Sequence, residues 1–313
     1  MLFTWDGSSP TMTRHVLSAL IRRPWRGRKF AVLVVGLGCV ALLLNGCANG
    51  LFYYPDSRVY STPAAAGQPY QDAWFTSRDG TKLHGWFIPS TTQSPALGTV
   101  VHFHGNAQNM TAHYSFVSWL PAEGFNVFVF DYRGYGDSAK KNPTRQGTFE
   151  DGVAALAHVH GRADVDPQRV ILYGQSLGGA LALSVAGETH PAGVRGVIAE
   201  SAFSSYRGAA GDVVGANSRL GALLRPLAWL LVSGGHDPEA VVDEISPVPL
   251  LLIHGTADTV VSYRHGEILF KKARQPKQLL TMTGAGHTAA AGSADMCRQI
   301  VAFMKQTLQS APP

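Results

Sequence analysis

Cysteine and charged residues are both scarce in this sequence, and each shortage excludes a class of protein. The 313 residues include 3 cysteines, of which only Cys297 lies beyond residue 47. A single thiol cannot form an internal disulfide, so the chain is not a small disulfide-stabilised scaffold. Charged residues make up 15% and apolar residues 45% of the chain. This balance is typical of a globular protein with a large buried core, not of a disordered chain.

The net charge of +5 is confined to the N-terminal region. Residues 1–46 contain six basic residues and one acidic residue, so 20 basic and 20 acidic residues remain of the totals of 26 and 21. The rest of the chain is therefore neutral, which argues against a basic surface for nucleic acid. Its length suits one large α/β domain.

The N-terminal region has the pattern of an export signal. Basic residues within 22–29 precede an apolar run over Phe30–Leu44, and Asn45-Gly46-Cys47 follows. About 15 apolar residues are too few for a typical membrane-spanning helix, which needs about 20. The order basic, apolar, small indicates a secretory signal over residues 1–46. Three interpretations of this segment are considered: an uncleaved anchor, an ordinary cleaved signal peptide, and a signal that is cleaved with attachment of lipid.

The end of this signal resembles a bacterial lipobox, in which the cysteine is lipid-modified and becomes the first mature residue. Leu44 and Gly46 fit that pattern around Cys47, and Ala48 after the cysteine implies the outer membrane, with the domain facing the periplasm. The Pro-, Ala- and Gly-rich residues 47–70 are interpreted as a lipid-attached tether. Residues 71–310 then form the folded domain, held at the membrane through an N-terminal lipid anchor.

Buried-strand patterns alternate with helical patterns along the predicted domain. Two alternating runs flank Ser77-Arg78-Asp79-Gly80, which is typical of a hairpin. This alternation predicts a mostly parallel sheet with helices on both faces and an antiparallel N-terminal hairpin. The predicted strands are Gln71–Thr76, Lys82–Ile88, Thr99–Phe103, Asn126–Tyr132, Val170–Tyr173, Val197–Ala199, Pro249–Ile253 and Gln278–Met282, and the predicted helices include Ala112–Leu120, Thr148–Val159 and Gly178–Ala186.

One long segment interrupts this alternation after the sixth predicted strand. Residues 204–244 exceed the usual connection of about 2–6 residues, and six leucines between Leu220 and Leu231 have helical spacing. Two interpretations remain open. The segment is either a helical insertion packed on the domain or a lid over an apolar substrate cleft.

The sharpest motif is Gly174-Gln175-Ser176-Leu177-Gly178, which follows the strand Val170–Tyr173 and opens a helix. This is the G-x-S-x-G pattern in its required strand–turn–helix context, and it predicts an α/β-hydrolase fold with Ser176 as nucleophile. The glycines are needed because side chains at positions 174 or 178 would collide with the neighbouring strand or helix. The helix start also places the Leu177 N–H beside the reacting centre.

A serine nucleophile needs a base, and the base needs an orienting acid. Asp258 follows the strand Pro249–Ile253 and His287 follows the strand Gln278–Met282, so both lie at the sheet edge that carries Ser176. The order Ser, Asp, His is that of the α/β-hydrolase fold. Glu200 also ends a strand and is the alternative acid.

The developing oxyanion needs hydrogen-bond donors. The loop His104-Gly105-Asn106-Ala107 ends the strand Thr99–Phe103, so the Asn106 and Leu177 N–H groups are the predicted oxyanion hole. His102 and His104 alone are too few to hold a metal. No cofactor is therefore expected.

With these motifs, the chain resembles the bacterial α/β-hydrolases of the depalmitoylase and serine-aminopeptidase-like group. The resemblance extends over about Leu51 to Thr307. The resemblance implies that Ser176, Asp258 and His287 form the catalytic triad. Gln175 and Thr288 depart from the Arg and Asn that relatives often carry there. The residues that carry it are Phe52-Tyr53-Tyr54-Pro55, Asp79-Gly80, Leu83-His84-Gly85-Trp86, His104-Gly105-Asn106-Ala107, the run DYRGYGDS over 131–138, Ser176-Leu177-Gly178-Gly179, Glu200-Ser201-Ala202-Phe203 and Gly286-His287.

The expected activity is metal-independent hydrolysis of an ester or thioester in a small-molecule or lipid acyl substrate. A serine aminopeptidase-like activity is the alternative within enzymes. A lipid-anchored binding protein that has kept the hydrolase fold is the alternative outside them. Neither the acyl group nor the oligomeric state follows from the sequence.

Overall fold

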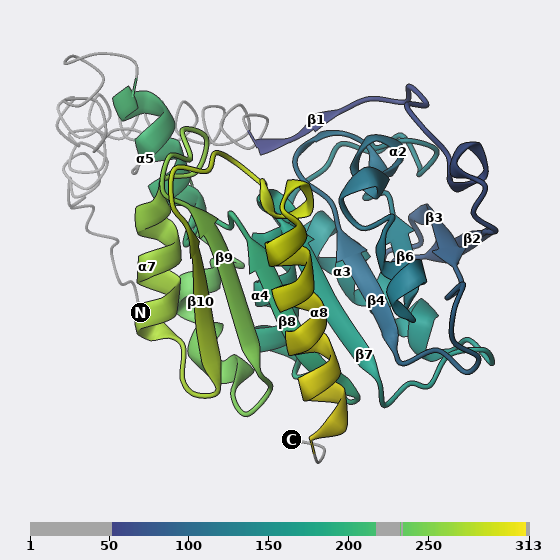
Figure 1. Cartoon of the computed structure of the whole chain (residues 1–313). Helices are drawn as coiled ribbons and strands as arrows, with labels where there is room; N and C mark the ends of the chain where they lie inside the picture. The colour runs from purple at the N-terminus through teal and green to yellow at the C-terminus, as the bar shows by residue number, and fades with distance from the viewer. Residues whose placement is uncertain (1–51, 217–231, 233, 311–313) are drawn as a thin grey trace, which may run out of the picture. The chain divides into compact units, whose positions relative to one another are not determined.

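The computed structural model describes residues 52–216, 232 and 234–310. The predicted leader, Cys47 and the leucines of 220–231 lie outside these residues. In the described part, one sheet has the strand order β10-β9-β8-β7-β4-β6-β3-β2 (Figure 1). Every strand pair is parallel except the two made by β3. The strands are β2 (Gln71–Thr76), β3 (Lys82–Ile88), β4 (Thr99–Phe103), β6 (Asn126–Phe130), β7 (Val170–Gln175), β8 (Val194–Glu200), β9 (Leu250–Gly255) and β10 (Lys277–Met282).

Helices cover both faces of the sheet, because successive strand residues point to opposite sides and both sides are apolar. In β7, Val170 and Leu172 pack with one group of helices, while Ile171 and Tyr173 pack with the other. Figure 1 shows α8 in front of the sheet and α4 behind it. The first group is α3 (Arg145–His160), α4 (Leu177–Thr189), α5 (Tyr206–Ala216) and α7 (Tyr263–Lys272), and the second is α2 (Met110–His113) and α8 (Ala294–Gln309).

The predicted fold class is confirmed, and one predicted helix is wrong. Residues 112–120 do not form a continuous helix, because α2 ends at His113 and two short 3-10 turns follow, at Tyr114–Phe116 and Leu120–Glu123. Val117 between these turns has φ −125° and ψ 0°. Pro121 has no N–H to extend an α-helix through this region. Among the described residues, no helix combines the length and apolar character needed to cross a bilayer.

Residues 52–70, which were predicted as part of a tether over 47–70, are instead folded onto the domain. Phe52 and Tyr53 are buried. Strand β1 (Tyr54–Pro55) pairs in parallel with β5 (Ala107–Gln108) to form a separate two-stranded sheet. Residues 63–66 form a 3-10 turn that Thr62 caps. The folded domain therefore includes residues 52–70.

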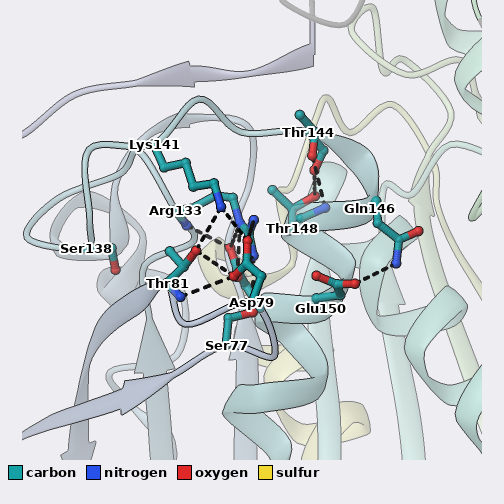
Figure 2. Close-up of polar contacts among 12 residues, drawn as sticks. Ser77, Asp79, Thr81, Arg133, Ser138, Lys141, Thr144, Gln146, Thr148 and Glu150 are labelled. Carbon is teal, nitrogen blue, oxygen red and sulfur yellow. Dashed lines mark hydrogen bonds and ion pairs between the residues drawn. The ribbon is translucent and has the colours of Figure 1, made fainter.

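An arginine of the DYRGYGDS run fastens the β2–β3 hairpin to α3 (Figure 2). Arg133 donates from Nε and Nη2 to both carboxylate oxygens of Asp151, at 2.9 and 2.7 Å. Its Nη1 donates to Asp79 in the hairpin turn at 2.9 Å, and its Nη2 also reaches Ser77 Oγ at 3.1 Å. Lys141 is a second cation on Asp79. The DYRGYGDS loop therefore has a structural role, which is to hold the hairpin against α3.

Replacing Arg133 by Met should lower the free energy of unfolding by about 3 kcal/mol, because Asp151 would keep a buried charge without its partner. The Asp151 side chain is 0% exposed. Arg298→Met is the matched control, since its ion pair with Asp295 is exposed and such pairs contribute little. Urea denaturation of both variants checks this. Equal decreases in the free energy of unfolding of the two variants would show that burial of the Arg133 network adds nothing to its contribution to stability.

Candidate active site

Ser176 stands in a strained turn between β7 and α4. Its backbone has φ 54° and ψ −118°, a conformation that L-residues rarely adopt. A Cβ at position 174 would lie 2.2 Å from the Gly178 carbonyl oxygen, and one at 178 would lie 2.0 Å from the Phe103 carbonyl oxygen. Only glycine fits at either position. This is the physical reason for the G-x-S-x-G spacing.

The structure brings His287 and Asp258 together. His287 Nδ1 lies 2.7 Å from Asp258 Oδ2, which leaves Nε2 to accept a proton. Asp258 Oδ1 also accepts the N–H groups of Val260 and Val261, both at 2.9 Å. Burial opposes the charge on Asp258, but the hydrogen bonds from His287, Val261 and Val260 outweigh it and hold the pKa of this carboxyl below its ordinary value.

The loop that carries His287 passes close to the end of β9. A Cβ on Gly255 would lie 2.3 Å from the Ala285 carbonyl oxygen. The Ala257 N–H donates to that same carbonyl at 3.0 Å. Gly255 is therefore needed for the Asp258 and His287 loops to lie side by side.

Ser176 and His287 are connected through the end of β8. Among the described residues, no hydrogen bond joins Ser176 Oγ to His287. The Ser176 N–H donates to the Glu200 carbonyl at 2.9 Å, and the Ala290 N–H donates to the Glu200 carboxylate at 2.8 Å. Glu200 therefore joins the Ser176 turn to the segment after His287, and serine–histidine contacts are often loose without substrate.

Glu200, the alternative acid, does not hydrogen-bond the imidazole. Its carboxylate instead accepts the Tyr173 hydroxyl at 2.9 Å and Gln175 Nε2 at 2.8 Å. Burial raises the pKa of Glu200, although the hydrogen bonds from Ala290, Gln175 and Tyr173 oppose this. Sequence reasoning considered Glu200 only as an acid, and its connecting role was missed.

His102 belongs to the same buried network and is not placed to react. Its Nε2 lies 3.2 Å from Gln175 Oε1. Burial lowers the pKa of His102 to about 3, so the ring is neutral at pH 7. Among the described residues, no three His, Cys, Asp or Glu side chains are grouped to hold a metal ion.

The two predicted oxyanion donors lie on adjoining segments. A Cβ on Gly178 would come within 2.5 Å of the His104 carbonyl oxygen, so the loop after β4 runs against the start of α4. Neither the Asn106 N–H nor the Leu177 N–H has an acceptor within the described part of the chain. Buried His104 donates from Nδ1 to the Gly105 carbonyl at 2.7 Å, which orients the peptide group that carries the Asn106 N–H. His104 therefore braces the loop.

The models of two known protein families match this chain. Residues 112–311 match the model of the prolyl oligopeptidase family, and residues 65–152 match that of the acetyl xylan esterases. The chain belongs to the prolyl oligopeptidase family. It is a hydrolase with the α/β-hydrolase fold.

Relatives of this family member occur in bacteria and eukaryotes. The YfhR protein of Escherichia coli K12 is 41% identical over 83% of this chain and 86% of its own length. Human alpha/beta hydrolase domain-containing protein 17B is 30% identical over 67% of both chains. An esterase structure from Pyrococcus furiosus superposes with a TM-score of 0.65 at 21% identity, covering 82% of this chain and 97% of that one. That structural likeness supports the fold alone.

The two buried carboxylates should give opposite pH dependences of stability. The folded-state pKa of Glu200 is raised above 4.5, so the native state keeps a proton that the unfolded chain loses, and stability falls as the pH rises through that window. Glu200→Gln should therefore gain stability relative to wild type as the pH rises above about 4.5. Urea denaturation at a series of pH values measures this difference.

Asp258→Asn should behave in the opposite way and serves as the matched variant. The folded-state pKa of Asp258 is lowered from 3.8, so its carboxylate contributes stability above that pH and loses it as the pH falls. The variant should thus lose stability relative to wild type as the pH rises through this lower window. If the stability difference from wild type changed with pH in the same direction for both variants, the environments assigned to the two carboxylates would be wrong.

Proposed function

We propose that this protein is a serine acyl hydrolase that cleaves carboxylic esters or thioesters through an acyl-enzyme on Ser176. The observation that carries the proposal is the 2.7 Å His287–Asp258 contact at the sheet edge that holds the strained Ser176. The free Asn106 and Leu177 N–H groups beside this serine support the same assignment.

His287 transfers protons in both steps of this mechanism, and the other groups position or stabilise. His287 Nε2 takes the proton of Ser176 Oγ as the oxygen attacks the substrate carbonyl. The Asn106 and Leu177 N–H groups stabilise the oxyanion, and His287 then protonates the departing alcohol or thiol. Water, activated by the same imidazole, cleaves the acyl-enzyme. Asp258 keeps the Nδ1 proton in place and stabilises the imidazolium.

Ester or thioester cleavage is favoured by the acetyl xylan esterase match over residues 65–152. Peptide cleavage is the second candidate, and the match to the prolyl oligopeptidase family over residues 112–311 favours it. The two candidates share the same nucleophile, so only the preferred substrate distinguishes them. A non-catalytic binding protein would cleave neither.

The full-length chain in detergent should hydrolyse short p-nitrophenyl esters, and Ser176→Ala should abolish this activity. Asp258→Asn should lower kcat by roughly 10⁴, because His287 loses its tautomer restraint. Asp295→Asn, at an exposed carboxylate, is the control and should have no effect. Leucine p-nitroanilide hydrolysed faster than any ester or thioester would favour the peptidase. A folded chain inactive on all these substrates would favour the binding protein.

We also propose that the chain is a lipoprotein of the bacterial envelope, attached through Cys47. Six residues lie between Cys47 and Tyr54, and a fully extended chain over these seven residue steps spans at most about 25 Å. Tyr54 lies beside Asn106, so this attachment would keep the catalytic edge near the bilayer. Two or more acyl chains anchor a protein stably, whereas one binds reversibly.

Full-length protein expressed in bacteria should incorporate labelled palmitate and sediment with membranes. Cys47→Ser should remove the label, and Cys39→Ser is the matched control that should keep it. If Cys47→Ser retains the label or leaves membrane retention unchanged, residues 1–46 act as an uncleaved anchor.

A further inference from the structure

The segment before the main sheet contacts the loop that carries the predicted oxyanion donor. We infer that residues 52–58, here called the N-terminal strap, position the oxyanion hole by holding the Asn106 carbonyl. This inference rests on the proposed function and adds Tyr54 and Tyr135 to it as positioning residues. Neither residue touches the reacting atoms.

The Asn106 carbonyl is held by two donors from different parts of the chain. The Tyr54 N–H donates to it at 2.9 Å, and the Tyr135 hydroxyl donates to it at 2.7 Å. Both lone pairs of this oxygen are therefore engaged. Burial raises the pKa of Tyr135, so its hydroxyl remains a neutral donor over the working pH range.

These contacts complete the restraint on Asn106. His104 fixes the peptide group before it, which carries the Asn106 N–H, and the N-terminal strap fixes the peptide group after it. With both flanking peptide planes held, the backbone dihedrals of Asn106 have little freedom. The direction of its N–H is then set before substrate arrives, which is what oxyanion stabilisation requires.

The loop needs such external support because its own conformation is costly. Gln108 has φ 65°, in a region that side chains other than Asn, Asp and Gly rarely adopt. The loop also leaves the main sheet after Phe103, so no strand of that sheet supports it. Pairing with the N-terminal strap, Tyr54 with Ala107 and Pro55 with Gln108, replaces that support.

The N-terminal strap is fixed at both of its own ends. At the start, Phe52 packs edge-on against Tyr206 with ring centroids 5.0 Å apart, and the Tyr53 hydroxyl lies 3.3 Å from Thr148 Oγ1. At the other end, Asn109 Nδ2 donates to Asp56 Oδ1 at 2.7 Å. The strap thus connects α3 and α5 at one end to the oxyanion loop at the other.

The test removes the two donors singly and together in the full-length chain. Tyr135→Phe removes one hydroxyl, and Tyr54→Pro removes one N–H. Tyr54→Phe keeps that N–H, and Val59→Pro places proline just beyond the strap, at an exposed residue whose N–H donates no hydrogen bond in the described structure. The readouts are kcat and KM for a p-nitrophenyl ester and the inhibition constant of a trifluoromethyl ketone, which forms a tetrahedral oxyanion adduct with serine.

Each donor variant should lower kcat roughly 10-fold and the double variant roughly 100-fold, approaching the loss of one oxyanion donor. KM should stay within about twofold, because only transition-state binding is affected. The inhibition constant of the trifluoromethyl ketone should rise by the same factor as kcat falls. The two control variants should match wild type. A structural defect alone would lower the unfolding temperature without this separation of kcat from KM.

An unchanged kcat in the folded double variant would overturn the inference, whether or not KM changes. If Tyr54→Pro does not fold, Tyr135→Phe decides, since it removes a single oxygen atom. Wild-type protein without hydrolytic activity would instead refute the proposed function. The two failures are therefore distinguishable.

Discussion

The turn from β7 into α4 leaves no space for a side chain at positions 174 and 178, two residues to either side of Ser176. The start of α4 lies within van der Waals contact of the end of β4, and this close approach holds Ser176 at φ 54°. The same approach brings the loop after β4 beside the Leu177 N–H. The strained serine and the two candidate oxyanion donors are thus consequences of one packing constraint. A second close approach, at Gly255, brings the Asp258 and His287 loops together in the same manner.

Two buried carboxylates at this edge have different environments and therefore different roles. Asp258 accepts two backbone N–H groups and the imidazole N–H, so it stays ionised beside a developing imidazolium. Glu200 accepts neutral donors in a site that is 1% exposed, and it joins the nucleophile strand to the loop after His287. Paired carboxyl groups with pKa values shifted in opposite directions are typical of catalytic sites.

Local patterns predicted most of this arrangement, and long-range contacts account for what they missed. The bounds of β2, β3 and β4 were predicted correctly, because alternation and turn residues are local signals. The segment 52–70 was interpreted as a tether from its composition, yet Phe52 and Tyr53 are buried by partners such as Thr148, 95 residues away from Tyr53. The connecting role of Glu200 was missed for the same reason, since it depends on the hydrogen bond from Ala290, 90 residues away. The lipid attachment and the lid remain predictions, because Cys47 and residues 217–231 lie outside the described structure.

The central claim is that Ser176 is a nucleophile activated by His287 and Asp258. Reaction of the full-length chain with a fluorophosphonate, followed by peptide mapping by mass spectrometry, tests it most directly. The account predicts one adduct per chain, located on Ser176, and a much slower reaction when His287 is replaced by Ala. An adduct on another residue, or no adduct on folded protein, would contradict it.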